Sequence, residues 1–433
     1  MNKLIQYARN WLAVLVSAVI VGFLLLTAVA MIPKEAILEN VTKSSVYLKD
    51  SPQTAKTTRL RRDNFTEAVM CAIAANVDDS KPVTSIMRNA YYRLGTPEAS
   101  FYHHYKNGTS KMRETLYHRY WHGYLVVLRP LLTVTDYQGI RCFNYIVLSI
   151  VTLVLLYFVK KRFNTAILLA VIISLLYASV FFVPQCIHFS ITFYVAMLGS
   201  IAVLECPWSK WGNVWFSSLF VLIGAITSYS DLIATPFIAL GLPLTFSLLK
   251  MLEKETLLYQ VESIIKLSAA WFFGYMGMWA AKWAIYALFI DQGGFASVIE
   301  KISERSIGGV PSYCTFERFF SEVFWFIPDI KNAWWCPAVI AFMASIINIL
   351  ICLFISRPEA SKKYSVLLII AAMPFAWLSL MYNHSLIHIF FVHRMWSITL
   401  LGVLLFAVLV ISNRNNLPKV ASSESKDENI EKQ

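Results

Sequence analysis

The sequence predicts an all-α polytopic membrane protein with about ten transmembrane helices and a large, partly helical first extracytoplasmic loop. The composition is the first reason: 57% of the 433 residues are hydrophobic and only 15% are charged, which is too apolar for a soluble chain of this length. The second reason is that apolar runs long enough to cross a bilayer recur along the chain, with short polar segments between them. The mean hydropathy of +0.57 agrees with both observations.

The distribution of charge predicts how the chain is oriented. Lys3 and Arg9 precede the apolar run 11–32, so the positive-inside rule places the N-terminus in the cytoplasm and the next loop outside. That run is too long for a cleaved signal peptide and is read as a retained anchor.

The net charge of +12 comes from Lys and Arg scattered at segment ends, which argues against nucleic acid as a partner. The seven cysteines include no C-x-x-C pair, so we expect neither a disulfide framework nor a structural zinc site.

The chain divides at its polar segments. We expect a cytoplasmic start and first span in 1–32, an extracytoplasmic loop with interfacial helices in 33–142, spans two to seven in 143–290, a second extracytoplasmic loop in 291–335, spans eight to ten in 336–412, and a disordered cytoplasmic tail in 413–433. The expected spans are 11–32, 143–159, 166–183, a fourth that ends at 204, 214–229, 232–249, 267–290, an eighth that ends at Arg357, 364–381 and 395–411. This count leaves both termini in the cytoplasm, and we expect the protein to be integral to the plasma or inner membrane.

The same topology places most of the chemically able side chains on the extracytoplasmic side. Soluble nucleotide donors are scarce there, and no glycine-rich phosphate loop occurs in the sequence. An activated donor would therefore arrive attached to a lipid. No cofactor is required by any motif, although two carboxylates in the first loop are compatible with a divalent cation; we do not assign a metal from the sequence.

The stretch Asp63-Asn64-Phe65-Thr66-Glu67 marks a junction between loop and helix. Asp63 is placed to cap the helix, and Glu67 follows one turn later on the same face. The structural interpretation is an ordinary N-cap. The functional interpretation is a catalytic carboxylate, Asp63 or Glu67, that deprotonates an acceptor hydroxyl.

The segment 117–129 mixes aromatic residues with histidine and arginine, which is typical of an interfacial helix. His118 and His122 have the spacing of zinc ligands on a helix, but Arg119 stands where a zinc protease needs glutamate. We take His122 and Arg129 as candidates for binding an anionic substrate group.

The segment 383–394 has an unusual density of histidine at the outer ends of two apolar runs. We expect His384, His388 and Arg394 to recognise a phosphate group, with a metal site or simple interfacial placement as the alternatives. Asp231 is read as a second acid or as a helix cap. Lys282 lies inside an expected span, near its middle, where a cation marks function or a buried ion pair.

Several short motifs together resemble the GT-C superfamily of membrane glycosyltransferases, and in particular an uncharacterised bacterial group of GT-C-like proteins. They are the Asp63–Glu67 stretch, Tyr120-Trp121-His122-Gly123 with Leu128-Arg129-Pro130-Leu131-Leu132, Asp231-Leu232 before Thr235-Pro236, and Asn383-His384-Ser385 with His388 and Arg394. The resemblance covers most of the chain except the tail. It implies a polyprenyl-phosphate-linked sugar as donor, an extracytoplasmic glycan or lipid-linked acceptor, inversion at the anomeric carbon, and Asp63 as the carboxylate of the first loop. Asp63 departs from the pattern because it lies farther from the first span than usual and is not part of an Asp-x-Asp.

The leading hypothesis is a glycosyltransferase in which Asp63 or Glu67 is the base while Arg129, His384, His388 and Arg394 hold the donor phosphate. One alternative is a polysaccharide polymerase or ligase that acts on lipid-linked glycans and relies on arginine and histidine without the carboxylate. The other is a lipid or glycan transporter, for which Lys282 is the main indication.

Overall fold

The computed structural model describes residues 3–51, 60–109, 111–206, 214–252, 255–291, 303, 323–324 and 337–413. The segments expected to form the second extracytoplasmic loop and the cytoplasmic tail lie almost wholly outside these residues. Within them the chain is mainly helical, as expected for an all-α protein.

A region of mostly short elements separates the first long helix from the apolar helices that follow. They are α1 (Lys3–Ala30), α2 (Lys34–Asp50), α3 (Asn64–Ala75), α4 (Pro82–Arg88), β1 (Tyr91–Arg93), α5 (Pro97–Tyr105), β2 (Arg113–Thr115), α6 (Leu125–Val134), α7 (Tyr137–Arg162), α8 (Thr165–Tyr177), η1 (Val183–Gln185), α9 (Ile187–Glu205), α10 (Val214–Ser230), α11 (Pro236–Met251), α12 (Leu257–Phe289), α15 (Pro337–Ser356), α16 (Pro358–Tyr364), α17 (Val366–Leu380), α18 (Tyr382–Ile387), α19 (Ile389–Val392), η3 (His393–Met395) and α20 (Trp396–Ser412). Strands β1 and β2 form one antiparallel pair, with Tyr91 opposite Thr115.

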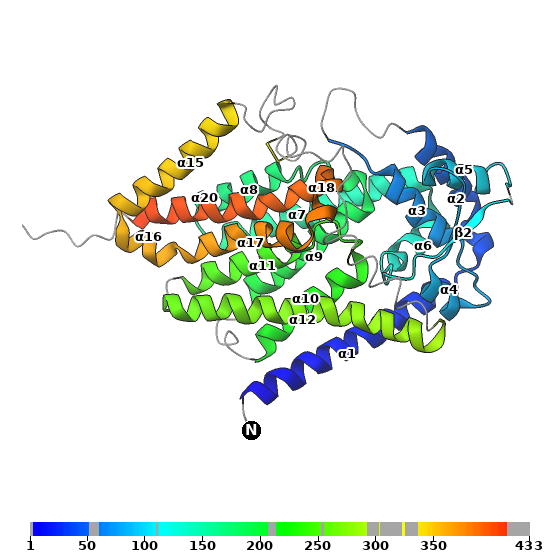
Figure 1. The fold of residues 1–433 in the computed structure, drawn as a ribbon, viewed down its shortest axis with the longest axis horizontal. Helices are drawn as coiled ribbons and strands as arrows, with labels where there is room; N and C mark the ends of the chain where they lie inside the picture. Colours follow the sequence, from blue (N-terminus) through cyan, green and yellow to red (C-terminus); the bar gives the residue numbers. More distant parts are fainter. Residues whose placement is uncertain are drawn as a thin grey trace, which may run out of the picture.

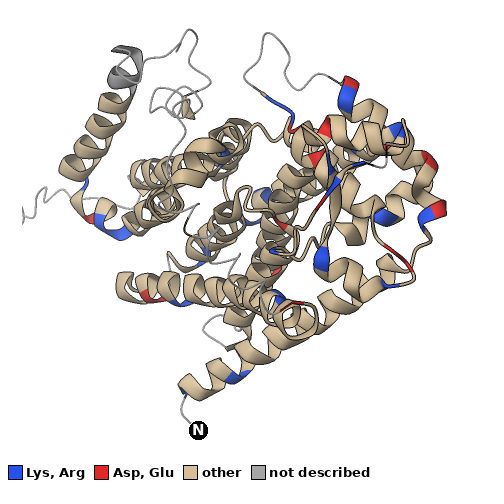
Figure 2. Ribbon diagram, turned by 45° about the vertical axis from the view of Figure 1, so that its right-hand side comes forward, with Lys and Arg blue, Asp and Glu red and all other residues tan. Residues whose placement is uncertain are grey.

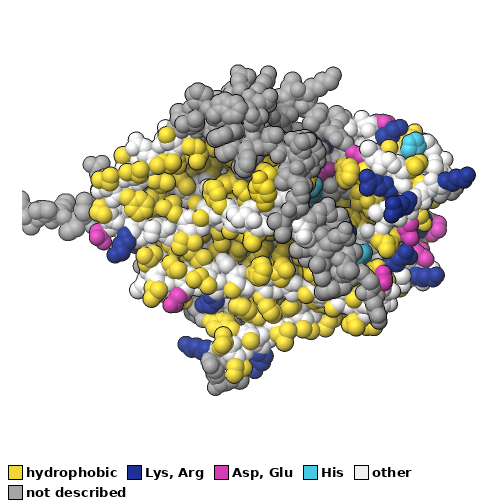
Figure 3. Space-filling model, viewed as in Figure 1, with side chains coloured by type: hydrophobic (Ala, Val, Ile, Leu, Met, Phe, Trp, Pro, Cys, Tyr) yellow, Lys and Arg dark blue, Asp and Glu magenta, His cyan; other side chains and the backbone are white. Residues whose placement is uncertain are grey.

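The two kinds of element occupy different parts of the molecule. Helices α2 to α6 and the small sheet gather at one end, whereas the long helices that follow run side by side away from it (Figure 1). We call the first part the polar unit, residues 33–136. Charged residues concentrate on the polar unit and at the opposite helix ends (Figure 2). Between them the visible surface is broadly hydrophobic (Figure 3), an arrangement compatible with a membrane protein.

Every predicted span coincides with a helix, but the helices differ in their ability to cross a bilayer. Four are long and apolar enough, namely α1, α7, α9 and the run 389–412 that ends in α20. The pair 343–356 and Pro358–Tyr364 would be a fifth, although it bends by 117°. Helices α8, α10, α11 and α17 are apolar but shorter. The structure therefore supports four to five membrane-crossing helices among the described residues.

Small residues lie where the long helices, which we call the bundle, approach one another most closely. A side chain at Gly224 of α10 would meet the Trp271 carbonyl oxygen of α12 at 2.0 Å, and one at Gly274 of α12 would meet the Val221 carbonyl oxygen at the same distance. The two helices thus pack backbone to backbone, which small residues permit in apolar bundles.

Some helix starts in and beside the polar unit have ordinary side-chain caps. The side chain of Asp63 accepts a hydrogen bond from the Thr66 amide at the start of α3, and Asp136 accepts one from the Gly139 amide at the start of α7. These caps satisfy backbone donors that have no partner within the helix. The cap interpretation of Asp63 is therefore confirmed.

Candidate functional site

The acidic motif lies where the polar unit meets the bundle. The two oxygens of the Asp63 carboxylate accept hydrogen bonds from Thr66, Oδ1 from the amide at 3.1 Å and Oδ2 from the hydroxyl at 2.7 Å. Asp63 is 8% exposed. The carboxylate is thus a cap, yet it points into the protein and not into solvent.

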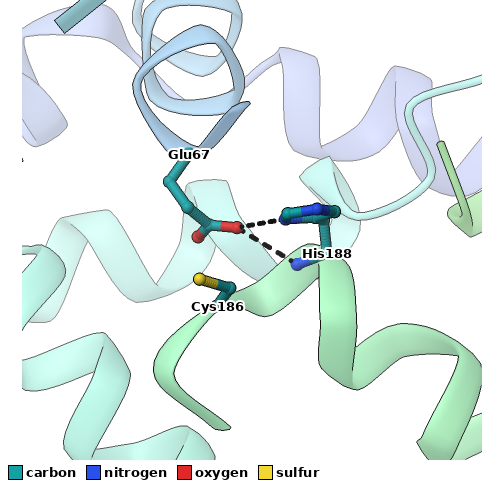
Figure 4. Close-up of side chains that lie close together, drawn as sticks. All are labelled: Glu67, Cys186 and His188. Atoms are coloured by element: carbon teal, nitrogen blue, oxygen red, sulfur yellow. Dashed lines mark hydrogen bonds and ion pairs between the residues drawn. The ribbon is translucent and has the colours of Figure 1, made fainter. Parts of the chain in front are cut away.

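Glu67 lies one turn further along α3 and is completely buried. Its oxygens accept hydrogen bonds from the amides of Ile187 and His188, each at 3.2 Å, and one of them lies 3.0 Å from Nδ1 of His188 (Figure 4). Ile187 and His188 open α9, where amide donors have no helical partner. A carboxylate at a helix N-terminus is also favoured by the helix dipole. Glu67 therefore joins the polar unit to a bundle helix.

His188 lies between the two carboxylates. Its Nδ1 faces Glu67, and its Nε2 is 3.4 Å from Oδ2 of Asp63. Cys186 adjoins them, because the Asp63 amide donates to its Sγ at 3.2 Å. Burial raises the pKa of the Cys186 thiol well above its usual value. We call Asp63, Glu67, Cys186 and His188 the carboxylate–histidine cluster.

A buried arginine supports the cluster from α7. Arg141 donates to Oδ1 of Asn64 at 2.8 Å and to the Tyr47 hydroxyl at 3.1 Å. The Asn64 amide nitrogen in turn donates to the Leu48 and Ser51 carbonyl oxygens at the end of α2. Asn64, which directly follows the cap residue Asp63, is therefore fixed to α2 and α7 at once.

Aromatic rings join the cluster to the histidine-rich segment 383–394. The ring of Phe391 lies 5.5 Å from that of His188 and 5.2 Å from that of His388, onto which it stacks. Arg394 is buried, and its guanidinium lies 4.5 Å from the ring of Phe189. On the other side, the guanidinium of Arg61 lies 4.2 Å from the ring of Phe390. The predicted acidic and basic stretches thus meet through a layer of rings.

His384 and Asp231 belong to the same neighbourhood. Nε2 of His384 is 2.9 Å from the carbonyl oxygen of Ile233, and both carboxylate oxygens of Asp231 accept from the Ala234 amide. Asp231 therefore caps the turn before α11. Its burial raises the pKa of the carboxyl to about 7, and the Ala234 amide and nearby His188 partly offset that rise.

The raised pKa gives a stability prediction. Between pH 4 and 7 the folded protein keeps the Asp231 proton that the unfolded chain releases, so stability is lost as pH rises through this window. Asp231→Asn removes this loss while an amide oxygen still accepts from Ala234. We expect the free energy of unfolding of the variant to increase relative to that of the wild type as pH rises, by about 4 kcal/mol above pH 7. Thermal unfolding in detergent from pH 4 to 8 measures it, and a difference independent of pH would contradict the assignment.

Arg129 lies away from the cluster, contrary to the predicted phosphate-binding role. Its guanidinium is fully buried and donates to the carbonyl oxygens of Val29 at 2.9 Å, Ile32 at 2.5 Å, and Ala74. Burial lowers the pKa of Arg129 to about 10, so it stays charged at neutral pH. It holds the ends of α1 and α3 together because last-turn carbonyls have no helical donor.

Lys282 was expected near the middle of a span, but the structure places it about two turns before the end of α12. Its buried ammonium donates to the carbonyl oxygens of Ile86 at 2.8 Å and Met87 at 3.2 Å, at the end of α4. It also lies 5.6 Å from the ring of Trp121. Lys282 thus anchors the polar unit onto the bundle, and this does not favour a transport path.

We expect Lys282→Met to lower the free energy of unfolding by about 1–3 kcal/mol, because two buried carbonyl groups lose their donor. Lys266→Met, on the same helix but half-exposed, is the matched control and should change it by less than about 0.5 kcal/mol. Thermal unfolding in detergent compares the two. Equal effects would show that the carbonyl contacts carry no special weight.

The expected interfacial helix over 117–129 is partly wrong, because the helix begins only at Leu125. His122 has a φ of 58°, in the left-handed region, and the Gly123 amide donates to the Tyr229 carbonyl oxygen at 2.8 Å. His122 is buried between the Tyr124 hydroxyl and the Tyr117 carbonyl oxygen, each at 2.8 Å. Burial lowers the pKa of His122 to about 3. The segment docks against α10 instead of lying on a surface, and His122 does not join the cluster.

An apolar cavity of about 670 Å³ lies next to Ile187, beside the cluster. Helices α6, α7, α9 and α10 line it, and Ile187, whose amide binds Glu67, is one of its walls. Val127, Phe143 and Leu198 also line it and are exposed on the outside of the bundle. The cavity therefore lies at the side of the bundle, and Ile187 is its link to the cluster, whose four residues do not line it.

No family model, curated protein or solved structure matches this chain. The likeness to GT-C enzymes remains a prediction from the sequence motifs.

Sequence reasoning did not single out Cys186, Arg141 or Arg61. The predicted topology puts His188 on the extracytoplasmic side, but no sequence motif gives it a role. One signal was available for His188 and Cys186, since both stand immediately at the start of an apolar run, where amide donors attract an anion. Nothing in the sequence links the start of this apolar run to Asp63 or Glu67, which lie more than a hundred positions earlier.

Proposed function

We propose that the chain is a membrane glycosyltransferase that moves a sugar from a polyprenyl-phosphate donor to an extracytoplasmic glycan or lipid-linked acceptor. The observation that carries the proposal is the carboxylate–histidine cluster at the junction of polar unit and bundle, with an apolar cavity whose wall includes Ile187, the residue that donates to Glu67. An acid–base centre beside a lipid-sized cavity suits a reaction between a lipid-linked donor and a polar acceptor.

Asp63 is the general base in this proposal. Glu67 already accepts from two amides and faces Nδ1 of His188, and it has no exposed surface. Asp63 retains a small exposed fraction and is bound only through its cap and the edge of His188. The arrangement therefore favours Asp63 over Glu67, and Glu67 becomes the residue that positions His188.

The acceptor hydroxyl oxygen attacks the anomeric carbon while the bond from that carbon to the phosphate oxygen breaks, which inverts the configuration. The acceptor proton passes to Asp63, and the bond electrons leave with the polyprenyl phosphate. Cations close to the departing phosphate stabilise its charge. Arg61, His388 and Arg394, which surround the ring layer, are the proposed donors, with His384 orienting the segment through Ile233.

The cavity between α6, α7, α9 and α10 would hold the first isoprene units of the donor. Its walls are almost entirely apolar, and each methylene group removed from water contributes about 0.8 kcal/mol. The proposal retains the topology of about ten spans with both termini cytoplasmic and the cluster extracytoplasmic. The shorter apolar helices α8, α10, α11 and α17 would then cross the bilayer where it is locally thinned, or where neighbouring segments occupy the remaining thickness.

A transfer assay tests the function. The full-length protein in proteoliposomes is given a polyprenyl-phosphate sugar with a radiolabelled sugar, together with glycan acceptors, and the release of polyprenyl phosphate is followed beside the labelled product. The proposal predicts the two in equal amounts. Extension of a lipid-linked glycan without use of monosaccharide donors would instead support a polymerase, and movement of intact donor across the bilayer would support a transporter.

A further inference from the structure

We propose that Glu67, Cys186 and His188 form a binding site for a divalent transition-metal ion of the zinc class. One ligand atom from each residue, a carboxylate oxygen, the thiol sulfur and an imidazole nitrogen, lies within 4.8 Å of the others. All three residues are buried. Figure 4 shows the three side chains close together, with Glu67 on α3 and Cys186 and His188 at the start of α9.

The ligand types select the metal. Thiolate and imidazole favour zinc and its neighbours, whereas Mg²⁺ and Ca²⁺ prefer oxygen ligands alone. Three protein ligands leave a tetrahedral ion one position for water or substrate, as in catalytic zinc sites. The site therefore differs from a two-carboxylate magnesium site, which the first-loop acids alone would suggest.

The surroundings supply each ligand with an outer partner. Metal-bound histidines usually direct their second nitrogen at a carboxylate, and Nε2 of His188 lies 3.4 Å from Oδ2 of Asp63. The Asp63 amide donates to Sγ of Cys186, and the Ile187 amide donates to Glu67. Such contacts fix the ligands before the ion arrives.

The buried position of His188 between two carboxylates is the independent observation. His188 is 2% exposed, and its Nε2 makes no hydrogen bond with the described residues, although it lies 3.4 Å from Oδ2 of Asp63. With Nδ1 bonded through its proton to Glu67, a neutral ring would present a lone pair at Nε2 to the Asp63 carboxylate. An ion on Nδ1 moves the ring proton to Nε2, where it faces Asp63. Either a metal ion on Nδ1 or a second ring proton makes Nε2 a donor to Asp63, and metal analysis separates the two.

The inference deepens the proposed function and rests on it for the role of the ion, which would lie beside the base. Its test does not depend on turnover. The untagged full-length protein, purified in detergent and dialysed, is analysed for metal by mass spectrometry before and after one equivalent of Zn²⁺. We expect about one ion per chain. His188→Gln and Cys186→Ser should reduce binding at least tenfold, whereas Cys142→Ser, at an exposed cysteine, should not.

A second measurement covers the case in which those variants fail to fold. Co²⁺ bound to the wild-type protein should give near-ultraviolet thiolate-to-metal absorption and visible bands typical of four ligands. Absence of stoichiometric metal, or a Co²⁺ spectrum without the thiolate band, would overturn the site. If metal binds as expected but the protein transfers no sugar, the site stands and the proposed function falls.

Discussion

Asp63→Asn is expected to lower the rate of sugar transfer by about 10²- to 10⁴-fold, the usual contribution of a general base. The folded state should survive, because asparagine is as good an N-cap as aspartate and its amide oxygen can still accept from Thr66. The loss should appear in kcat, since the acceptor proton is taken only as the new bond forms. Initial rates with labelled donor, at saturating acceptor, measure it.

The chain offers a matched control for this change. Asp136 caps α7 through the Gly139 amide at 3.1 Å, in the same way that Asp63 caps α3. Asp136→Asn should therefore cost the same small amount of stability and leave transfer unchanged. If the two variants transfer sugar equally well, Asp63 is a cap and nothing more, and the base must be sought elsewhere.

Arg129→Met is expected to have the largest effect on stability. Three backbone carbonyl oxygens at the ends of α1 and α3 would lose a charged donor inside the protein. Each buried group left without a partner costs about 1–3 kcal/mol, so a loss of about 3 kcal/mol or more should strongly reduce the amount of folded protein. Membrane yield and thermal unfolding in detergent measure it.

The comparison for Arg129 is Arg93→Met, at the exposed end of strand β1 in the same polar unit. That variant should change the free energy of unfolding by less than about 0.5 kcal/mol. A stable Arg129→Met protein with weakened donor binding would favour the phosphate-binding role predicted from the sequence.

Much of the helical architecture is predictable because an apolar run must satisfy its own backbone hydrogen bonds. Each expected span falls on a helix, and the cap at Asp63 follows from its position before Phe65, Val69 and the rest of α3. The boundaries are less predictable. Pro236 starts α11 after the turn that Asp231 caps, so the helix begins later than the apolar run.

The partners of the charged residues were not predictable from sequence. Arg129, Lys282 and His122 all looked available for an anion, yet each is committed to backbone carbonyls or a hydroxyl in the structure. The rule that a buried polar group needs a partner says that such contacts exist. It cannot say which distant helix end supplies them. His188 shows the reverse case, since its two carboxylate neighbours come from a helix over a hundred residues away.

The most direct test of the account is to find where the reacting end of the donor lies. A polyprenyl phosphate with a photoreactive group beside the phosphate is irradiated with the full-length protein in proteoliposomes, and the labelled peptides are sequenced. The account predicts labelling of peptides that contain Arg61 to Glu67, Ile187 to Phe189 or His388 to Arg394, with competition by unlabelled donor. Labelling confined to other parts of the chain, or labelling that unlabelled donor does not reduce, would contradict a transfer centre at the carboxylate–histidine cluster.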